Sequence, residues 1–110
     1  MVYDAPNLLS PADDFVFIKG NTINLAWESV GDLAIDEQYA VRLVYFHTNE
    51  VVYKGEQLSS TTWQVPLDLY HEADGPKFEY FWYVYIERVL ADGTAIQISP
   101  ESETRFFTWD

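Results

Sequence analysis

The segment from Phe78 to Val89, which reads FEYFWYVYIERV, constrains the fold more than any other part of the chain. It is rich in the aromatic and β-branched residues that favour strands. Side chains alternate between the two faces of a strand. One face carries Tyr80, Trp82, Val84 and Ile86, and the other carries Phe81, Tyr83 and Tyr85. Since both faces are apolar, the pattern predicts a long strand that packs on a core with one face and leaves a second apolar face to be covered.

Shorter segments of similar character recur along the chain, separated by turn residues. Alternation is clear in residues 22–27 and 39–46, and shorter runs follow at 51–54, 61–65, 96–98 and 104–109. The Asp92-Gly93 pair is typical of a hairpin turn. Prolines interrupt an expected edge strand at residues 5–11, and one helical turn is expected at residues 67–71. The spacing predicts an all-β fold, a seven-stranded immunoglobulin-like antiparallel β-sandwich, with residues 1–110 as a single domain.

The inward positions of these strands define the predicted core. With 48% hydrophobic residues, the chain has enough apolar material for one core. The expected core residues are Leu25, Trp27, Tyr39, Val41, Leu43, Trp63, Val65, Trp82, Val84, Ile86, Phe107 and Trp109. We also expect Leu33 and Ile35 to be tucked beneath the loop at residues 28–37.

The charge of the chain excludes two classes of partner. Eighteen acidic residues against six basic ones give a formal net charge of −12. Nucleic acids and anionic membranes both require clusters of lysine and arginine, so neither is an expected partner. No apolar run reaches the roughly 18 residues that span a bilayer, so no membrane insertion is expected. The first residues lack the pattern of a signal peptide, so the signal of an exported protein would lie upstream.

The residue types that carry catalysis or bind metals lack the patterns those functions need. Cysteine is absent, which excludes disulfides and thiolate chemistry. His47 and His71 lie in predicted loops without partners at metal-ligand spacing, and the acidic pairs do not match a calcium loop. No serine has the context of a nucleophile elbow, and no glycine-rich phosphate loop occurs. We therefore expect no catalytic residue, no metal and no cofactor, and a protein that is not an enzyme.

A set of short motifs resembles those of fibronectin type III and related immunoglobulin-like domains. The motifs are Pro6-x-Leu8-x-Ser10-Pro11, Leu25-x-Trp27, Tyr39-x-Val41-x-Leu43, Tyr80-x-Trp82-x-Val84-x-Ile86 and Ser102-x-x-Arg105-x-Phe107-x-Trp109. The last is similar to the closing strand of repeats in large bacterial surface or secreted proteins. The chain departs from the usual Leu-x-Pro-x-x-x-Tyr corner, because Pro66 lies too far from Tyr80. The resemblance implies a non-catalytic module of a larger exported protein, which spaces neighbouring domains or binds another protein.

The resemblance also places the second apolar face. In such a sandwich the third and sixth strands are neighbours, so their outward residues form one surface. The predicted interaction face consists of Arg42, Val44, Phe46, Phe81, Tyr83 and Tyr85. A contiguous exposed apolar patch usually marks an interaction site.

Three interpretations of this face remain open from the sequence. The aromatic residues can form cross-strand pairs that stabilise the sheet. They can contact a neighbouring domain, a second copy or another protein. They can also form a platform for a neutral polysaccharide, in which case the chain is a carbohydrate-binding accessory module. A sugar platform requires coplanar exposed rings, whereas a packing face requires rings that interdigitate or are covered.

Overall fold

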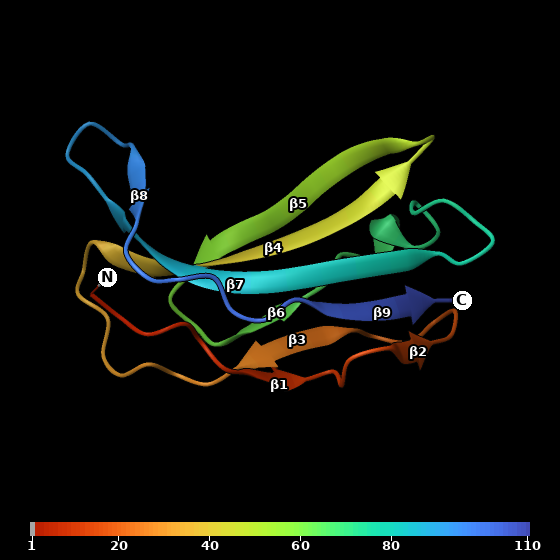
Figure 1. The fold of residues 1–110 in the computed structure, drawn as a ribbon, viewed down its shortest axis with the longest axis horizontal. Coiled ribbons are helices and arrows are strands. Elements are labelled where there is room, and N and C mark those ends of the chain that lie inside the picture. Colours follow the sequence, from red (N-terminus) through yellow and green to blue (C-terminus); the bar gives the residue numbers. More distant parts are fainter. Residues whose placement is uncertain (1) are drawn as a thin grey trace.

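Two β-sheets packed face to face make up the computed structural model, which describes residues 2–110 (Figure 1). The smaller sheet has the order β1-β3-β6, with β1 at Leu8–Ser10, β3 at Asn24–Trp27 and β6 at Thr62–Gln64. The larger sheet has the order β2-β9-β7-β4-β5, and β8 also pairs with β7. Its strands are β2 (Phe15–Phe17), β4 (Glu37–His47), β5 (Glu50–Leu58), β7 (Glu79–Val89), β8 (Ala95–Gln97) and β9 (Arg105–Trp109). The predicted all-β sandwich is confirmed.

The strand count differs from the predicted seven for two local reasons. β2 is a short edge strand that runs parallel to β9, so the sandwich is not wholly antiparallel. The strand that returns after the Asp92-Gly93 turn is split into β8 and β9 by residues 98–104. The expected helical turn is a 3-10 turn at Leu67–Leu69. Within residues 2–110, no helix is long and apolar enough to cross a membrane.

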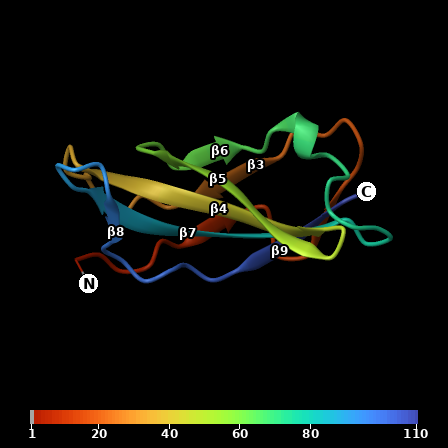
Figure 2. The ribbon, with the colours of Figure 1, turned by 90° about the horizontal axis from the view of Figure 1, so that it is seen from above.

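The long strands β4 and β7 form the centre of the larger sheet. They pair antiparallel from Glu37 opposite Arg88 to Val44 opposite Phe81. β5 pairs with the other edge of β4 over nine residues. Figure 2 shows these strands running along the length of the molecule. The residues of FEYFWYVYIERV therefore lie in the middle of a sheet, with neighbours on both sides.

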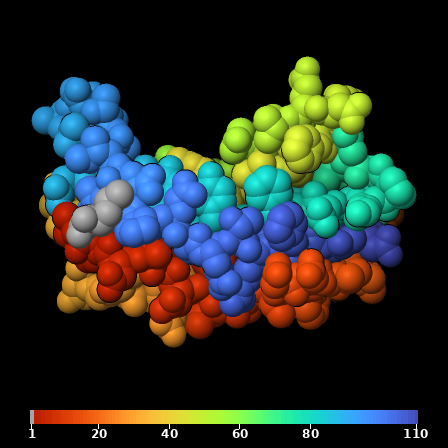
Figure 3. All heavy atoms as spheres, viewed as in Figure 1, coloured from red at the N-terminus to blue at the C-terminus, as the bar shows by residue number. Residues whose placement is uncertain are grey.

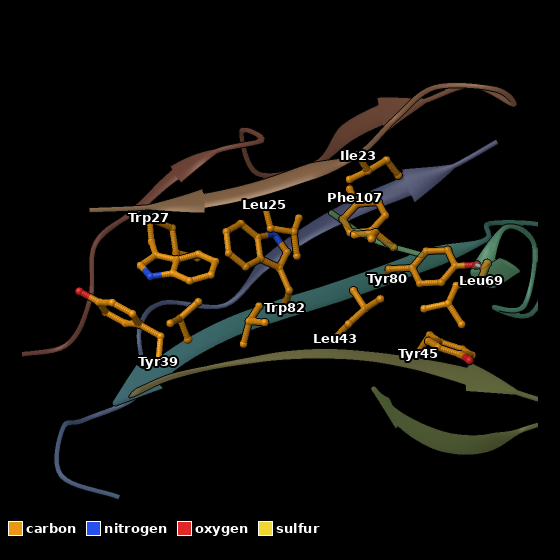
Figure 4. Packing of buried hydrophobic residues seen from close by; sticks show 14 of the residues in the cluster. Ile23, Leu25, Trp27, Tyr39, Leu43, Tyr45, Leu69, Tyr80, Trp82 and Phe107 are labelled. Atoms are coloured by element: carbon orange, nitrogen blue, oxygen red, sulfur yellow. Dashed lines mark hydrogen bonds between the residues drawn. The ribbon is translucent and has the colours of Figure 1, made fainter. Parts of the chain in front are cut away.

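The core lies between the two sheets, where aromatic rings from both layers meet (Figure 4). Every predicted core residue except Trp63 is buried. Trp63 is only half-buried, because it lies on the edge strand β6 and its indole Nε1 donates a hydrogen bond to Glu56 Oε2 at 2.9 Å. Burying these large side chains is the main favourable contribution to folding.

Of the two residues expected beneath the loop at residues 28–37, only one lies there, so the prediction for the other is wrong. Leu33 packs against the core, but Ile35 is fully exposed. The amide of Glu37 donates to Ala34 O at 3.0 Å, and Glu37 Oε1 accepts from the Ala34 amide at 2.8 Å. This tight turn points Ile35 into solvent.

The interruption between β8 and β9 is bridged by two buried serines. Ser99 Oγ accepts from the Ile86 amide at 2.8 Å, and Ser102 Oγ accepts from the Val84 amide at 2.9 Å. These hydroxyls take the place of carbonyls in a regular strand ladder. Thus β7 keeps its hydrogen bonds along this edge although its partner strand is broken.

Tyr80 ties the insertion before β7 to the core. Its hydroxyl donates to Leu69 O at 2.5 Å and accepts from the Ala73 amide at 3.1 Å. These contacts are similar to those of a tyrosine corner, in which the hydroxyl binds backbone a few residues upstream, but here the partners lie 7 and 11 residues upstream. The Tyr80 hydroxyl thus anchors the longer segment between Pro66 and β7.

Candidate interaction face

The outward side chains of the larger sheet form the candidate interaction face. Strand register places Arg42 opposite Tyr83 and Val44 opposite Phe81. On the other edge of β4, Val51 lies opposite Phe46 and Tyr53 lies opposite Val44. On the far side of β7, Phe106 lies opposite Phe81. The six predicted residues therefore share one face, which β5 and β9 extend.

The expectation that Val44 belongs to an exposed surface is wrong. Its side chain is only 1% exposed. It is flanked by Tyr53 of β5 on one side and Phe81 of β7 on the other, so two larger aromatic neighbours cover it. Val44 is therefore unavailable to a partner.

The half of the face around Tyr83 and Tyr85 is also partly covered. Both tyrosines and Arg42 are half-buried. The two rings lie 6.4 Å apart with an interplanar angle of 23°, and the Arg42 guanidinium carbon lies 5.6 Å from the centre of the Tyr85 ring. Burial raises the pKa of Tyr83, and the nearby Glu101 charge raises it further. Each of the two tyrosine rings therefore has the other beside it, and Arg42 lies over Tyr85.

The half of the face at the β4–β5 turn is exposed. Three large apolar residues there form what we call the hairpin patch: Phe46 (53% exposed), Val51 (47%) and Tyr53 (63%). Of these three, Phe46 belongs to the face predicted from the sequence, whereas Val51 and Tyr53 were missed. The signal for them was present, because a two-residue turn at Thr48-Asn49 places Val51 directly opposite Phe46.

A groove of about 400 Å³ adjoins the hairpin patch. Phe46, Phe81 and Phe106 supply its apolar lining. The rings of Phe81 and Phe106 lie 5.4 Å apart. The remaining lining residues are Asn49, Asp74, Gly75, Pro76, Lys77 and Glu79. Figure 3 shows the wider surface hollowed between the β4–β5 turn, in yellow-green, and the β7–β8 hairpin, in light blue.

Asp74 holds the two walls of the groove together. Its carboxylate oxygens accept from the amides of Thr48 at 2.7 Å and Asn49 at 2.9 Å. Its own amide donates to Phe46 O at 2.8 Å. The hydrogen bonds from Asn49 and then Thr48 lower the pKa of the Asp74 carboxyl group. The tip of the β4–β5 hairpin is thus attached to the segment before β7, which gives the groove a defined shape.

The histidines and acidic residues do not assemble a metal site in the described part of the chain. Within residues 2–110, no group of three or more histidine, aspartate or glutamate side chains is placed to hold an ion. His47 Nδ1 lies 2.6 Å from Glu72 O, so this histidine forms a local contact with the segment before β7.

One solved structure among the comparisons with known proteins supports the fold. No protein-family model matches the sequence, and no curated protein matches it. The human fibronectin type III domain of fibronectin type III domain containing protein 3 superimposes with a TM-score of 0.51. The identity is 15%, over 99% of this chain and 87% of that one. The fibronectin(III)-like modules of Clostridium thermocellum CbhA give a TM-score of 0.45 and 15% identity, over 94% and 93% of the two chains.

The human domain and this chain share a sandwich over nearly their whole lengths while differing at most positions. A likeness of this kind concerns the arrangement of strands, and it carries no site residue from one protein to the other. The chain therefore has a fibronectin type III-like fold.

Proposed function

We propose that this chain is a non-catalytic module that binds another protein, or an adjoining domain, through the hairpin patch and the neighbouring groove. The observation that carries this proposal is the contiguous exposure of Phe46, Val51 and Tyr53 beside a groove lined by further aromatic rings. Exposed apolar patches on soluble domains commonly mark protein interfaces. The fibronectin type III-like fold supports the same role, because it is a modular scaffold on which binding surfaces vary.

The ring geometry supports a protein contact over a sugar platform. The nearly parallel rings of Tyr83 and Tyr85 are half-buried, and Arg42 lies over Tyr85. A pyranose ring would need an open aromatic surface at that place. The exposed apolar residues instead lie at the hairpin patch, where a partner side chain can enter the groove.

Site-specific photo-cross-linking tests the proposal. A benzophenone amino acid replaces Tyr53 in one variant and the fully exposed Ile35, in the loop before β4, in a control variant. In cells that produce the parent protein, we expect a discrete cross-linked product from position 53 and none from position 35. Excess unlabelled domain should suppress the product, whereas a domain carrying Phe46→Ser and Tyr53→Ser should not.

Two outcomes would contradict the proposed interface. Equal products from positions 53 and 35 would indicate non-specific contact. Retardation of the domain in gels that contain a neutral polysaccharide, abolished by Tyr83→Ala with Tyr85→Ala, would favour the carbohydrate-binding alternative.

We further propose that the parent is an exported protein in which this domain lies outside the cytoplasm. The support is the resemblance of the closing motif, Ser102 to Trp109, to repeats of bacterial surface and secreted proteins. Fractionation of the source cells with an antibody against the domain tests this proposal. Recovery of the antigen only from the cytoplasmic fraction would contradict it.

A further inference from the structure

The groove beside the hairpin patch combines an apolar lining with a charged rim. Phe46, Phe81 and Phe106 line it, and its volume of about 400 Å³ lies within the roughly 300–1,000 Å³ of ligand clefts. Such a space accepts a large apolar side chain from a partner. The apolar lining thus defines one half of what the partner must carry.

The rim of the groove is acidic. Two carboxylates, Asp74 and Glu79, and one ammonium group, Lys77, line it. Glu79 is exposed, and in residues 2–110 it forms no salt bridge or side-chain hydrogen bond. Asp74 is held ionised by two backbone amides. A partner therefore meets negative charge at the groove, within a molecule of net charge −12.

On the same face, a cationic side chain of the domain itself already lies over an aromatic ring. The Arg42 guanidinium carbon lies 5.6 Å from the centre of the Tyr85 ring, within the range of a cation–π contact. Tyr53, on the same face, exposes its ring to solvent. A lysine or arginine from a partner can therefore contact Tyr53 as Arg42 contacts Tyr85.

We propose that the partner presents a short segment of alternating apolar and basic residues, an inference that rests on the proposed function. One large apolar side chain enters the groove between the phenylalanine rings. One lysine or arginine of the segment contacts Glu79 at the rim, and another contacts the face of Tyr53. A second copy of this chain fits the surface poorly, because it would bring together two molecules that each carry a net charge of −12.

Three blocked octapeptides serve as probes of this proposal. They alternate leucine with lysine, with glutamine or with glutamate. Binding is measured by calorimetry at low ionic strength, and by amide chemical shifts that locate the peptide on the domain. We expect saturable binding of the leucine–lysine peptide, with shifts concentrated in β4, β5 and the segment at residues 74–79. We expect weaker binding of the glutamine peptide and none of the glutamate peptide.

Three variants separate specific binding from general attraction. Phe46→Ser removes an exposed apolar contact and should weaken binding about tenfold. Glu79→Gln removes the free rim charge and should weaken binding about threefold. Asp32→Asn removes the same amount of charge from an exposed position in the loop before β4, and should leave the affinity unchanged. Circular dichroism checks that each variant is folded.

The possible results distinguish this inference from the proposed function. If the cross-link at position 53 forms but the glutamate peptide binds as well as the lysine peptide, the interface stands and the basic partner is wrong. Equal weakening by Asp32→Asn and Glu79→Gln would also overturn the basic segment, since the attraction would then be general. If sedimentation velocity detects dimers of the wild-type domain and Phe46→Ser dissociates them, the partner is a second copy of the chain and not a basic segment. If neither cross-link nor saturable peptide binding occurs, both proposals fail.

Discussion

Single hydroxyl groups replace strand pairing at the break between β8 and β9. Ser102 donates its amide to Val84 O at 2.8 Å and accepts the Val84 amide on its side-chain oxygen at 2.9 Å. Ser99 Oγ accepts the Ile86 amide at 2.8 Å, while the amide of Ile98 donates to Ile86 O at 2.9 Å. A serine can complete a ladder here because its hydroxyl reaches the position that a carbonyl would occupy in a regular strand.

Ser102→Ala should therefore destabilise the fold. The substitution leaves the buried Val84 amide without an acceptor, which costs about 1–3 kcal/mol of unfolding free energy. The matched control is Ser59→Ala at an exposed position, which should change stability by less than about 0.5 kcal/mol. Urea unfolding followed by tryptophan fluorescence measures both. Equal effects of the two substitutions would show that the hydroxyl of Ser102 is not needed by β7.

Glu37 joins three separate segments at one end of the sandwich. It accepts hydrogen bonds from the Tyr3 hydroxyl at 2.5 Å, the Ala34 amide at 2.8 Å and Arg88 Nη2 at 3.0 Å. The hydrogen bond from Tyr3, followed by that from Ala34, lowers the pKa of the Glu37 carboxyl group below its ordinary value. The ionised carboxylate is thus the form that the folded state favours.

The lowered pKa predicts a loss of stability in acid. Because the unfolded chain binds the proton more readily, the contribution of Glu37 is complete above its unfolded pKa of about 4.3. It is lost as the pH falls through the lower folded-state pKa. Melting temperatures measured from pH 6 to pH 3 should fall less steeply for Glu37→Gln than for the wild type. Parallel curves for the two proteins would contradict this assignment.

At the scale of elements, β5 depends on a glycine for its close approach to β4. Gly55 has φ of +147°, and a Cβ at this position would lie 2.0 Å from Val41 O. The atom it would meet is backbone, so it cannot rotate away. The same strand carries Val51 and Tyr53 of the hairpin patch, so its path sets where that patch lies.

Gly55→Ala should displace β5 and weaken the fold by about 1–3 kcal/mol. Gly93→Ala is the matched control, because Gly93 also has a positive φ of 88° but a Cβ at that position would have no atom within 4 Å. We expect Gly93→Ala to lower the melting temperature less than Gly55→Ala does. Amide chemical shifts in β5 should change only for Gly55→Ala. An equal loss from both would mean that backbone conformation alone, and not the contact with Val41, requires glycine.

At the scale of the whole molecule, the net charge of −12 opposes compaction through self-repulsion. Salt screens this repulsion, since the Debye length falls from about 30 Å at 0.01 M to about 8 Å at 0.15 M ionic strength. The melting temperature should therefore rise between these two conditions. Sucrose at matched osmolarity serves as the uncharged control. An unchanged or lower melting temperature in salt would show that local ion pairs, such as Arg88 with Glu37, outweigh the overall repulsion.

The pattern of residues along the chain determined the β-sandwich, most of its core and the two faces of its central strands. This succeeded because alternation in a strand is a local property, and a side chain of β4 or β7 can point only to one face or the other. Trp82 and Tyr83 could be assigned to opposite faces without knowledge of any neighbour. The six residues of the predicted interaction face were brought to one surface for the same reason.

Only the tertiary structure decided which outward residues are exposed. Val44 is covered while Phe46, two residues away on the same face, is open, because aromatic rings flank Val44 on both neighbouring strands. Ile35 projects into solvent because the turn closed by Glu37 sets its direction. Exposure depends on what lies beside a residue on other strands, and the groove between Phe46, Phe81 and Phe106 exists only once three distant segments pair.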